Sequence, residues 1–142
     1  MTTPKGMLER LQSLDVDRAI KMTLGLTSKI IIEKNQDQML NGFRADDSYI
    51  LPEYTPYTRE KKEEKGWDPD KVTLYDTGDF YNAMFADVSY FDIEIDSTDS
   101  KTEDLIEKYG EKIFGLSDES KEEYRDDAMP VLIEKIKEIL KL

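Results

Sequence analysis

The sequence predicts an α+β fold, because apolar residues at helical spacing near both ends of the chain enclose segments that alternate as strands do. Near the start, Ile20, Leu24 and Ile31 recur at intervals of four and seven residues. Between residues 84 and 96, apolar side chains occupy alternate positions. A second helical stripe near the end consists of Met129, Leu132, Ile133, Ile136, Ile139 and Leu140. The 142 residues fit one domain.

The first long helix is expected from about residue 15 to residue 40. Asp15 and Asp17 suit the positive end of a helix dipole, and Asn41-Gly42 supplies a stop signal. Gly25 weakens the middle by about 1 kcal/mol relative to alanine. Residues 1–14 are expected to be a flexible arm or a separate short helix, outside an α+β domain of residues 15–142.

Residues 43–71 are expected to form an extended loop, because three prolines interrupt any periodicity and residues 61–65 form a charge run of the solvated kind. Loops of this length inside a compact domain are often ordered by a neighbouring chain. Its aromatic side chains therefore have two interpretations, as anchors at a subunit interface or as part of the chain's own core. They are Tyr49, Tyr54, Tyr57 and Trp67.

A turn and two antiparallel strands are expected next. Asp76 or Thr77 is placed to cap a brief helix that runs through Phe80. The strands should then meet near residues 89–92 and bury one face, since Phe91, Ile93 and Ile95 alternate with acidic residues.

The last third of the chain predicts two helices. The first runs through Leu105 and Ile106 and stops at Gly110, and Ser117 or Asp118 begins the second. Pro130 should either kink this final helix or stand in the first turn of a new one.

Composition excludes several classes of chemistry. The chain has no cysteine and no histidine, which removes disulfides, thiolate nucleophiles, imidazole bases and nearly all zinc sites. Its formal net charge is -12, and residues 92–128 hold five basic against fourteen acidic residues. Such a surface repels phosphate backbones, so nucleic-acid binding is disfavoured. No membrane span, signal peptide or cofactor is expected, and the chain is expected to be made in the cytoplasm.

Two motifs have a catalytic or metal-binding interpretation. Asp76-Thr77-Gly78 has the residue types of an aspartic-protease turn, which would act as a dimer whose two carboxylates share a proton. That fold is almost all strand, and Asp79 replaces the usual small residue after the turn. A calcium loop starting at Asp96 lacks glycine at its sixth position, where Lys101 stands.

Four segments in order resemble phage proteins of Bacteroides-type phages and prophages, and more distantly the virion-morphogenesis and tail-completion group. They are residues 35–42, 54–58, 72–81 and 108–116. In that group a turn with Asp-Thr-Gly precedes a two-strand unit, and a Tyr-Gly or Phe-Gly segment precedes the last helix. The matching residues here are Asp76, Thr77, Gly78, Phe80, Tyr109, Gly110, Phe114 and Gly115.

The resemblance implies a small antiparallel sheet packed by a long N-terminal helix and a C-terminal helix. It also implies a non-catalytic virion protein, assembled in the host cytoplasm as a ring at the head-tail neck. Its partners would be further copies of itself and other neck, portal or tail proteins, with genomic DNA passing through the lumen without specific binding. The protease dimer and an acidic adaptor or inhibitor of a basic partner remain the alternatives.

Overall fold

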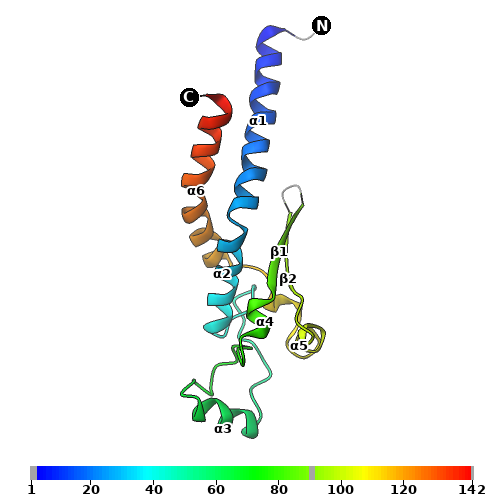
Figure 1. The fold of residues 1–142 in the computed structure, drawn as a ribbon, viewed down its shortest axis with the longest axis vertical. Helices are drawn as coiled ribbons and strands as arrows, with labels where there is room; N and C mark the ends of the chain where they lie inside the picture. The colour runs from blue at the N-terminus through cyan, green and yellow to red at the C-terminus, as the bar shows by residue number, and fades with distance from the viewer. Residues whose placement is uncertain (1–2, 90–91, 142) are drawn as a thin grey trace.

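The computed structural model describes residues 3–89 and 92–141, and its α+β fold confirms the predicted class. Strands β1 (Met84–Ser89) and β2 (Asp92–Ser97) form an antiparallel two-stranded sheet beside the helices (Figure 1). Along the other side of the molecule, α1 (Pro4–Leu26) and α6 (Asp118–Leu140) lie next to each other and extend beyond the rest of the fold (Figure 1).

The long N-terminal helix differs from its prediction at both its start and its middle. It begins at Pro4, with Thr3 Oγ1 accepting a hydrogen bond from the Gly6 amide at 3.0 Å, so no separate arm of residues 1–14 exists within the described chain. At Thr27 the helix is interrupted, and α2 (Ser28–Leu40) continues from there. The stop at Asn41-Gly42 is confirmed, and Gly42 takes a positive φ of 85°.

The predicted extended loop 43–71 is wrong in its centre, where α3 (Pro56–Glu64) forms. Thr55 Oγ1 accepts from the Thr58 amide at 3.3 Å, and Pro56 occupies the first helical position, where its missing N–H is harmless. Before α3, the guanidinium of Arg44 donates to the carbonyl oxygens of Tyr49, Leu51 and Tyr109 at 2.7–2.9 Å. The segment is therefore ordered by its own chain.

The predicted strand pair is confirmed, with Asp87 opposite Glu94 and Val88 opposite Ile93. The residues that join the strands, including Phe91, lie outside the described chain. The inner face is half-buried rather than fully buried, and it faces α2 and the start of α6 across a cavity lined by Ile31, Ile95 and Tyr124.

Short elements precede and follow the two strands in the chain. α4 (Asp79–Asn82) precedes β1, and α5 (Thr102–Tyr109) ends at Gly110 as predicted. A 3₁₀ turn, η1 (Glu111–Ile113), leads to Ser117, whose hydroxyl caps α6 by accepting from the Ser120 amide at 3.2 Å. Pro130 lies inside α6, so the alternative that it begins a new helix is wrong.

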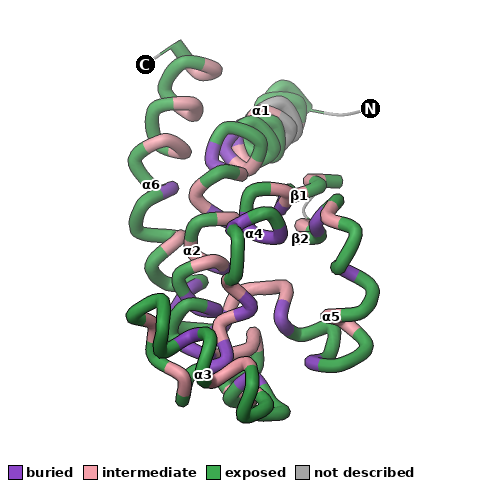
Figure 2. Tube along the Cα trace, turned by 60° about the horizontal axis from the view of Figure 1, so that its bottom comes forward, coloured by how far each residue is buried: buried purple, intermediate pink, exposed green. Residues whose placement is uncertain are grey.

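The core lies among the elements drawn between α3 and the outer turns of α1 in Figure 1. Its buried side chains come from α2, the loops, α4, β1, α5 and η1: Met39, Ile50, Val72, Leu74, Phe80, Tyr81, Met84, Tyr109 and Ile113. Figure 2 shows buried segments gathered around these elements, whereas the C-terminal turns of α6 are exposed or half-buried. The protein is thus a small packed body that carries a two-helix arm.

Candidate functional site

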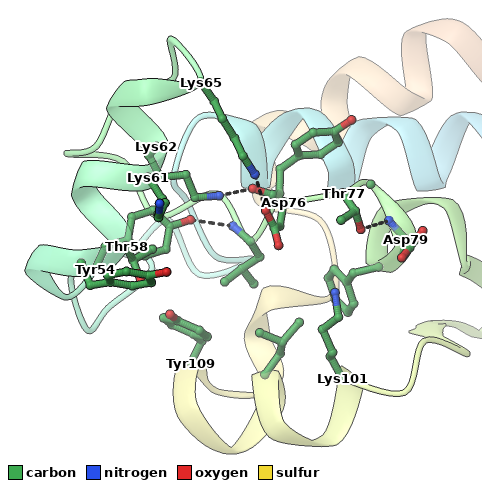
Figure 3. Close-up of a pocket in the computed structure, with 16 residues that line it drawn as sticks. Tyr54, Thr58, Lys61, Lys62, Lys65, Asp76, Thr77, Asp79, Lys101 and Tyr109 are labelled. Atoms are coloured by element: carbon green, nitrogen blue, oxygen red, sulfur yellow. Dashed lines mark hydrogen bonds and ion pairs between the residues drawn. The ribbon is translucent and has the colours of Figure 1, made fainter.

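A cleft of about 340 Å³ opens between α3, the turn at residues 74–80 and α5. Lysine and tyrosine side chains dominate its walls, as Figure 3 shows. α3 supplies Lys61 and Lys62, Lys65 follows its last turn, and Lys101 stands at the start of α5. We call this the lysine cleft, defined by Lys61, Lys62, Lys65 and Lys101.

Lys62 is fixed in the wall of the cleft, where only 7% of it is exposed. Its ammonium donates a hydrogen bond to the carbonyl oxygen of Tyr75. The same nitrogen lies 5.1 Å from the ring centre of Tyr54 and 4.8 Å from that of Trp67, within cation–π range. These contacts stabilise the buried charge with a carbonyl dipole and ring electrons, and no ion pair to Lys62 is formed among the described residues.

Asp76 forms an ion pair with Lys65 at 2.8 Å across the mouth of the cleft. The hydrogen bond from Lys65 holds the pKa of the Asp76 carboxyl below its usual value, against a smaller opposing effect of burial. Asp76 therefore does not cap α4. Thr77 Oγ1 accepts from the Asp79 amide at 3.3 Å, and Gly78 stands at the cap position with a φ of 92°. A Cβ at Gly78 would lie 3.1 Å from the Tyr75 hydroxyl oxygen.

The lysine cleft has the opposite charge sign to the protein as a whole. Its four ammonium groups face two lining carboxylates, those of Asp76 and Asp79, whereas the whole chain carries -12. Concave sites focus the field of the charges that line them. The cleft is therefore suited to a carboxylate-rich or other anionic partner.

The four aromatic residues predicted as interface anchors divide into two groups. Tyr49 and Tyr57 are 66% and 70% exposed. Tyr54 and Trp67 are half-buried and make internal contacts: the Tyr54 hydroxyl accepts from the amides of Thr73 and Leu74, and Trp67 packs edge-on against Tyr75. Only the first pair remains available to a neighbouring chain.

The predicted motif residues are brought together by the core. The ring centres of Phe80 and Phe114 lie 5.7 Å apart, and buried Tyr109 reaches the lysine cleft. Gly110 and Gly115 adopt φ values of 92° and 114°, which disfavour other residues. These motif residues therefore have structural roles. Phe80 and Tyr109 are part of the core, Phe114 packs against it, and the two glycines form turns with positive φ.

Two buried amides of α2 hold the segment that precedes α6. Asn35 donates to the Ile113 carbonyl oxygen at 2.9 Å and accepts from the Gly115 amide at 3.0 Å. Gln38 donates to the Gly115 carbonyl oxygen and accepts from the Ser117 amide at 2.8 Å. This network fixes the direction in which α6 leaves the core.

The arm formed by α1 and α6 leaves apolar side chains in solvent. Along α1, the exposed large hydrophobic residues are Met7, Leu8, Val16, Met22 and Leu26, and Met129 and Ile133 continue the set on α6. An almost wholly apolar groove of about 130 Å³ lies between the two helices, lined by Ile20, Leu24, Ala128 and Leu132 among others. Leu26 alone is 61% exposed.

Two observations on this chain weigh against the protease alternative. Asp76 is paired with a cation, which favours the ionised carboxylate rather than a shared proton. Strands account for two short segments of the described chain, where a protease of that type is nearly all strand.

Across residues 3–89 and 92–141 no group of three or more acidic residues is arranged to hold a metal ion. In the same residues, no helix combines the length and the apolar character that a membrane span requires.

Sequence reasoning missed the lysine cleft and the network of Asn35 and Gln38. The run at residues 61–65 looked like a solvated face, yet Lys62 is buried. The available signal was the Thr55-Pro56 pair, which marks a helix start and places Lys62 and Lys65 on one face toward Trp67.

Comparison of the chain with protein-family models, with curated proteins and with solved structures finds no match.

Proposed function

We propose that this protein is a non-catalytic assembly subunit, a structural protein of the tailed-phage virion that forms a ring at the head-tail neck. The phage assignment is supported by the segment resemblance around Asp76-Thr77-Gly78 and residues 108–116. The assembly role is supported by a feature of the fold itself, the apolar arm of α1 and α6. The observation that carries the proposal is the amount and kind of surface this arm leaves exposed.

The chain exposes more surface than a compact monomer of its size. Its accessible surface is 9615 Å² at 16.5 kDa. Compact monomers of this mass expose about 7,600 Å². The excess of roughly 2,000 Å² is comparable to what a stable protein–protein interface buries in total. A subunit that completes its packing against neighbours has this property.

The chemistry of the arm supports burial rather than permanent exposure. Met7, Leu8 and Leu26 are each more than half exposed on one helix. Burying apolar surface contributes about 25 cal/mol per Å², so contact between arms stabilises an oligomer strongly. Large apolar side chains exposed in this number on one helix favour an interaction surface on a soluble protein.

Light scattering combined with size exclusion tests the assembly role. We expect the wild-type protein to have a mass several times 16.5 kDa at concentrations of about 10 µM, a range typical of specific complexes. The double variant Leu8→Glu/Leu26→Glu should be monomeric, because it places charges on the apolar arm. The control Glu9→Gln/Lys29→Gln alters exposed polar residues of α1 and of the following helix α2, and should assemble as the wild type does.

Two results would contradict the proposal. A wild-type chain that stays monomeric at every concentration has no self-assembly, and a chain that instead forms one-to-one complexes with a basic protein is an adaptor. The virion role is tested separately, by labelling assembled phage particles with an antibody against this chain. Label at the head-tail junction is expected, and particles without label would rule out the virion role.

A further inference from the structure

Two ammonium groups of the lysine cleft, those of Lys62 and Lys101, act on the Asp76 carboxylate through space but form no direct ion pair among the described residues. Neither Lys62 nor Lys101 lies within 4 Å of an acidic oxygen among the described residues. Lys62 is only 7% exposed, and its ammonium lies against the rings of Tyr54 and Trp67. A buried cation is stabilised by an arriving anion more than an exposed one is, since less solvent screens the pair. The cleft therefore favours an anionic occupant.

One face of the β1–β2 hairpin carries the opposite pattern. Asp87, Asp92, Glu94 and Asp96 are all exposed and lie on the same face, since Asp87 is opposite Glu94 and the others are two residues apart. None of the four forms an ion pair among the described residues. Like charges directly opposite each other destabilise an isolated pair of strands.

The same hairpin face carries an aromatic ring. Phe85 is 43% exposed and lies opposite Asp96. The lysine cleft in turn is lined by the rings of Tyr54, Tyr57 and Tyr109, and Tyr57 is 70% exposed with the Lys61 ammonium 5.5 Å from its ring centre. Both surfaces thus combine charge with aromatic groups, and the charges are complementary in sign.

We propose that the acidic face of the hairpin of one copy docks in the lysine cleft of the next. This contact rests on the self-assembly proposed above and specifies its second surface. The hairpin points along α1, away from α3, so that a copy does not fill its own cleft (Figure 1). A contact between two different surfaces is heterologous, and repeated heterologous contacts close into a ring when the rotation permits.

A paired charge-reversal experiment tests the contact. Lys61→Glu/Lys101→Glu makes the cleft acidic. Asp87→Lys/Asp92→Lys/Glu94→Lys leaves three lysines against Asp96, so it makes the hairpin face basic while keeping like charges at the opposed positions 87 and 94. Each variant alone should lose about tenfold or more in self-association at about 50 mM salt, where surface charges are weakly screened. An equimolar mixture should regain assembly, because each reversed surface then meets an opposite one. The readout is mass by light scattering.

The control Lys29→Glu/Lys141→Glu makes the same change in net charge at exposed positions outside the cleft and should assemble normally. Recovery in the mixture also shows that both variants are folded. If the wild type assembles but the cleft and hairpin variants do so equally well, the docking is wrong and the assembly proposal stands. If the wild type is monomeric, both are wrong. If inorganic phosphate binds in the cleft while the hairpin variant assembles as the wild type does, the cleft is a site for a small anion and the docking is wrong.

Discussion

Lys62 illustrates how a single residue in a charged run can differ from its neighbours. Lys61 and Lys65 reach solvent, whereas Lys62 is enclosed by Tyr54, Trp67 and the Tyr75 carbonyl oxygen. The helix turns by about 100° per residue, so adjacent lysines point in different directions. The lysine cleft exists because α3 aims one of them inward.

Asp76→Asn should lower the free energy of unfolding by no more than about 1 kcal/mol, because the ion pair with Lys65 is largely exposed. The lowered pKa of Asp76 means that this stabilisation is present above the carboxyl's usual value of 3.8 and is lost as the pH falls through the folded-state pKa. Urea titrations of wild type and variant should therefore converge at acid pH.

The matched control for this change is Asp79→Asn, which lies on the same turn and forms no ion pair among the described residues. It leaves the Asp76–Lys65 ion pair in place, so it should not reproduce the loss of stability expected for Asp76→Asn. A pH-independent loss in Asp76→Asn would contradict the assignment to Lys65.

Asn35→Leu should destabilise the protein by about 2–4 kcal/mol, since the Ile113 carbonyl and the Gly115 amide lose their partners inside the protein. Chemical denaturation followed by circular dichroism measures this. Asn41→Leu is the control, because its amide donates to the Asp37 carbonyl oxygen on an exposed surface. A small effect of Asn35→Leu would mean that water replaces its two bonds.

At the scale of the element, the long helix predicted from one amphipathic stripe is in fact two helices. α1 and α2 are separated at Thr27, whose hydroxyl is 2.6 Å from both the Thr23 carbonyl oxygen and the Tyr124 hydroxyl. This contact joins the break in the first helix to α6. The direction of the arm therefore depends on two sets of contacts, the one between Thr27 and Tyr124 and the bonds of Asn35 and Gln38 to the segment before α6.

Pro130→Ala should raise the free energy of unfolding by about 1–3 kcal/mol, because an internal proline removes a helix hydrogen bond and crowds the preceding turn. Pro130 is exposed, so the substitution loses little packing. Thermal unfolding of a monomeric variant background measures the gain. A loss of stability would instead mean that the arm requires the geometry of the proline. Val131→Ala is the control for a substitution to alanine at the next position of α6.

At the scale of the molecule, the arm makes the protein longer than its chain length requires. A compact chain of 142 residues has a radius of gyration of about 14.5 Å. The 23 residues of α1 alone span about 34 Å. Small-angle X-ray scattering of the monomeric Leu8→Glu/Leu26→Glu variant should give a clearly larger radius than the compact value. A radius near 14.5 Å would show that the arm folds back in solution.

Much of the fold could be predicted from local patterns. The alternation at residues 84–96 predicted β1 and β2, Gly110 predicted the end of α5, and Asn41-Gly42 predicted the end of α2. These signals act over a few residues, through backbone sterics and the period of side-chain direction. The start of α1 and the helix α3 were missed, although Thr3-Pro4 and Thr55-Pro56 carry the same local signal in both places.

The candidate site was predicted only in part. Tyr109 and the turn at Asp76 were singled out from the sequence, and both line the lysine cleft. Lys101 and Lys62 were not, because their proximity depends on how α3 and α5 pack around the core, and no spacing along the chain records that.

The sequence alone determined the two strands, the helical ends of the chain, the negative charge and the absence of cysteine and histidine chemistry, since these follow from local periodicity and composition. Only the tertiary structure decided that Tyr54 and Trp67 serve the chain itself while Tyr49 and Tyr57 stay exposed. It also decided that a basic cleft forms on an acidic protein and that α1 and α6 project as an apolar arm. The physical reason is that burial and local charge depend on contacts between residues far apart in the chain, which local patterns do not encode.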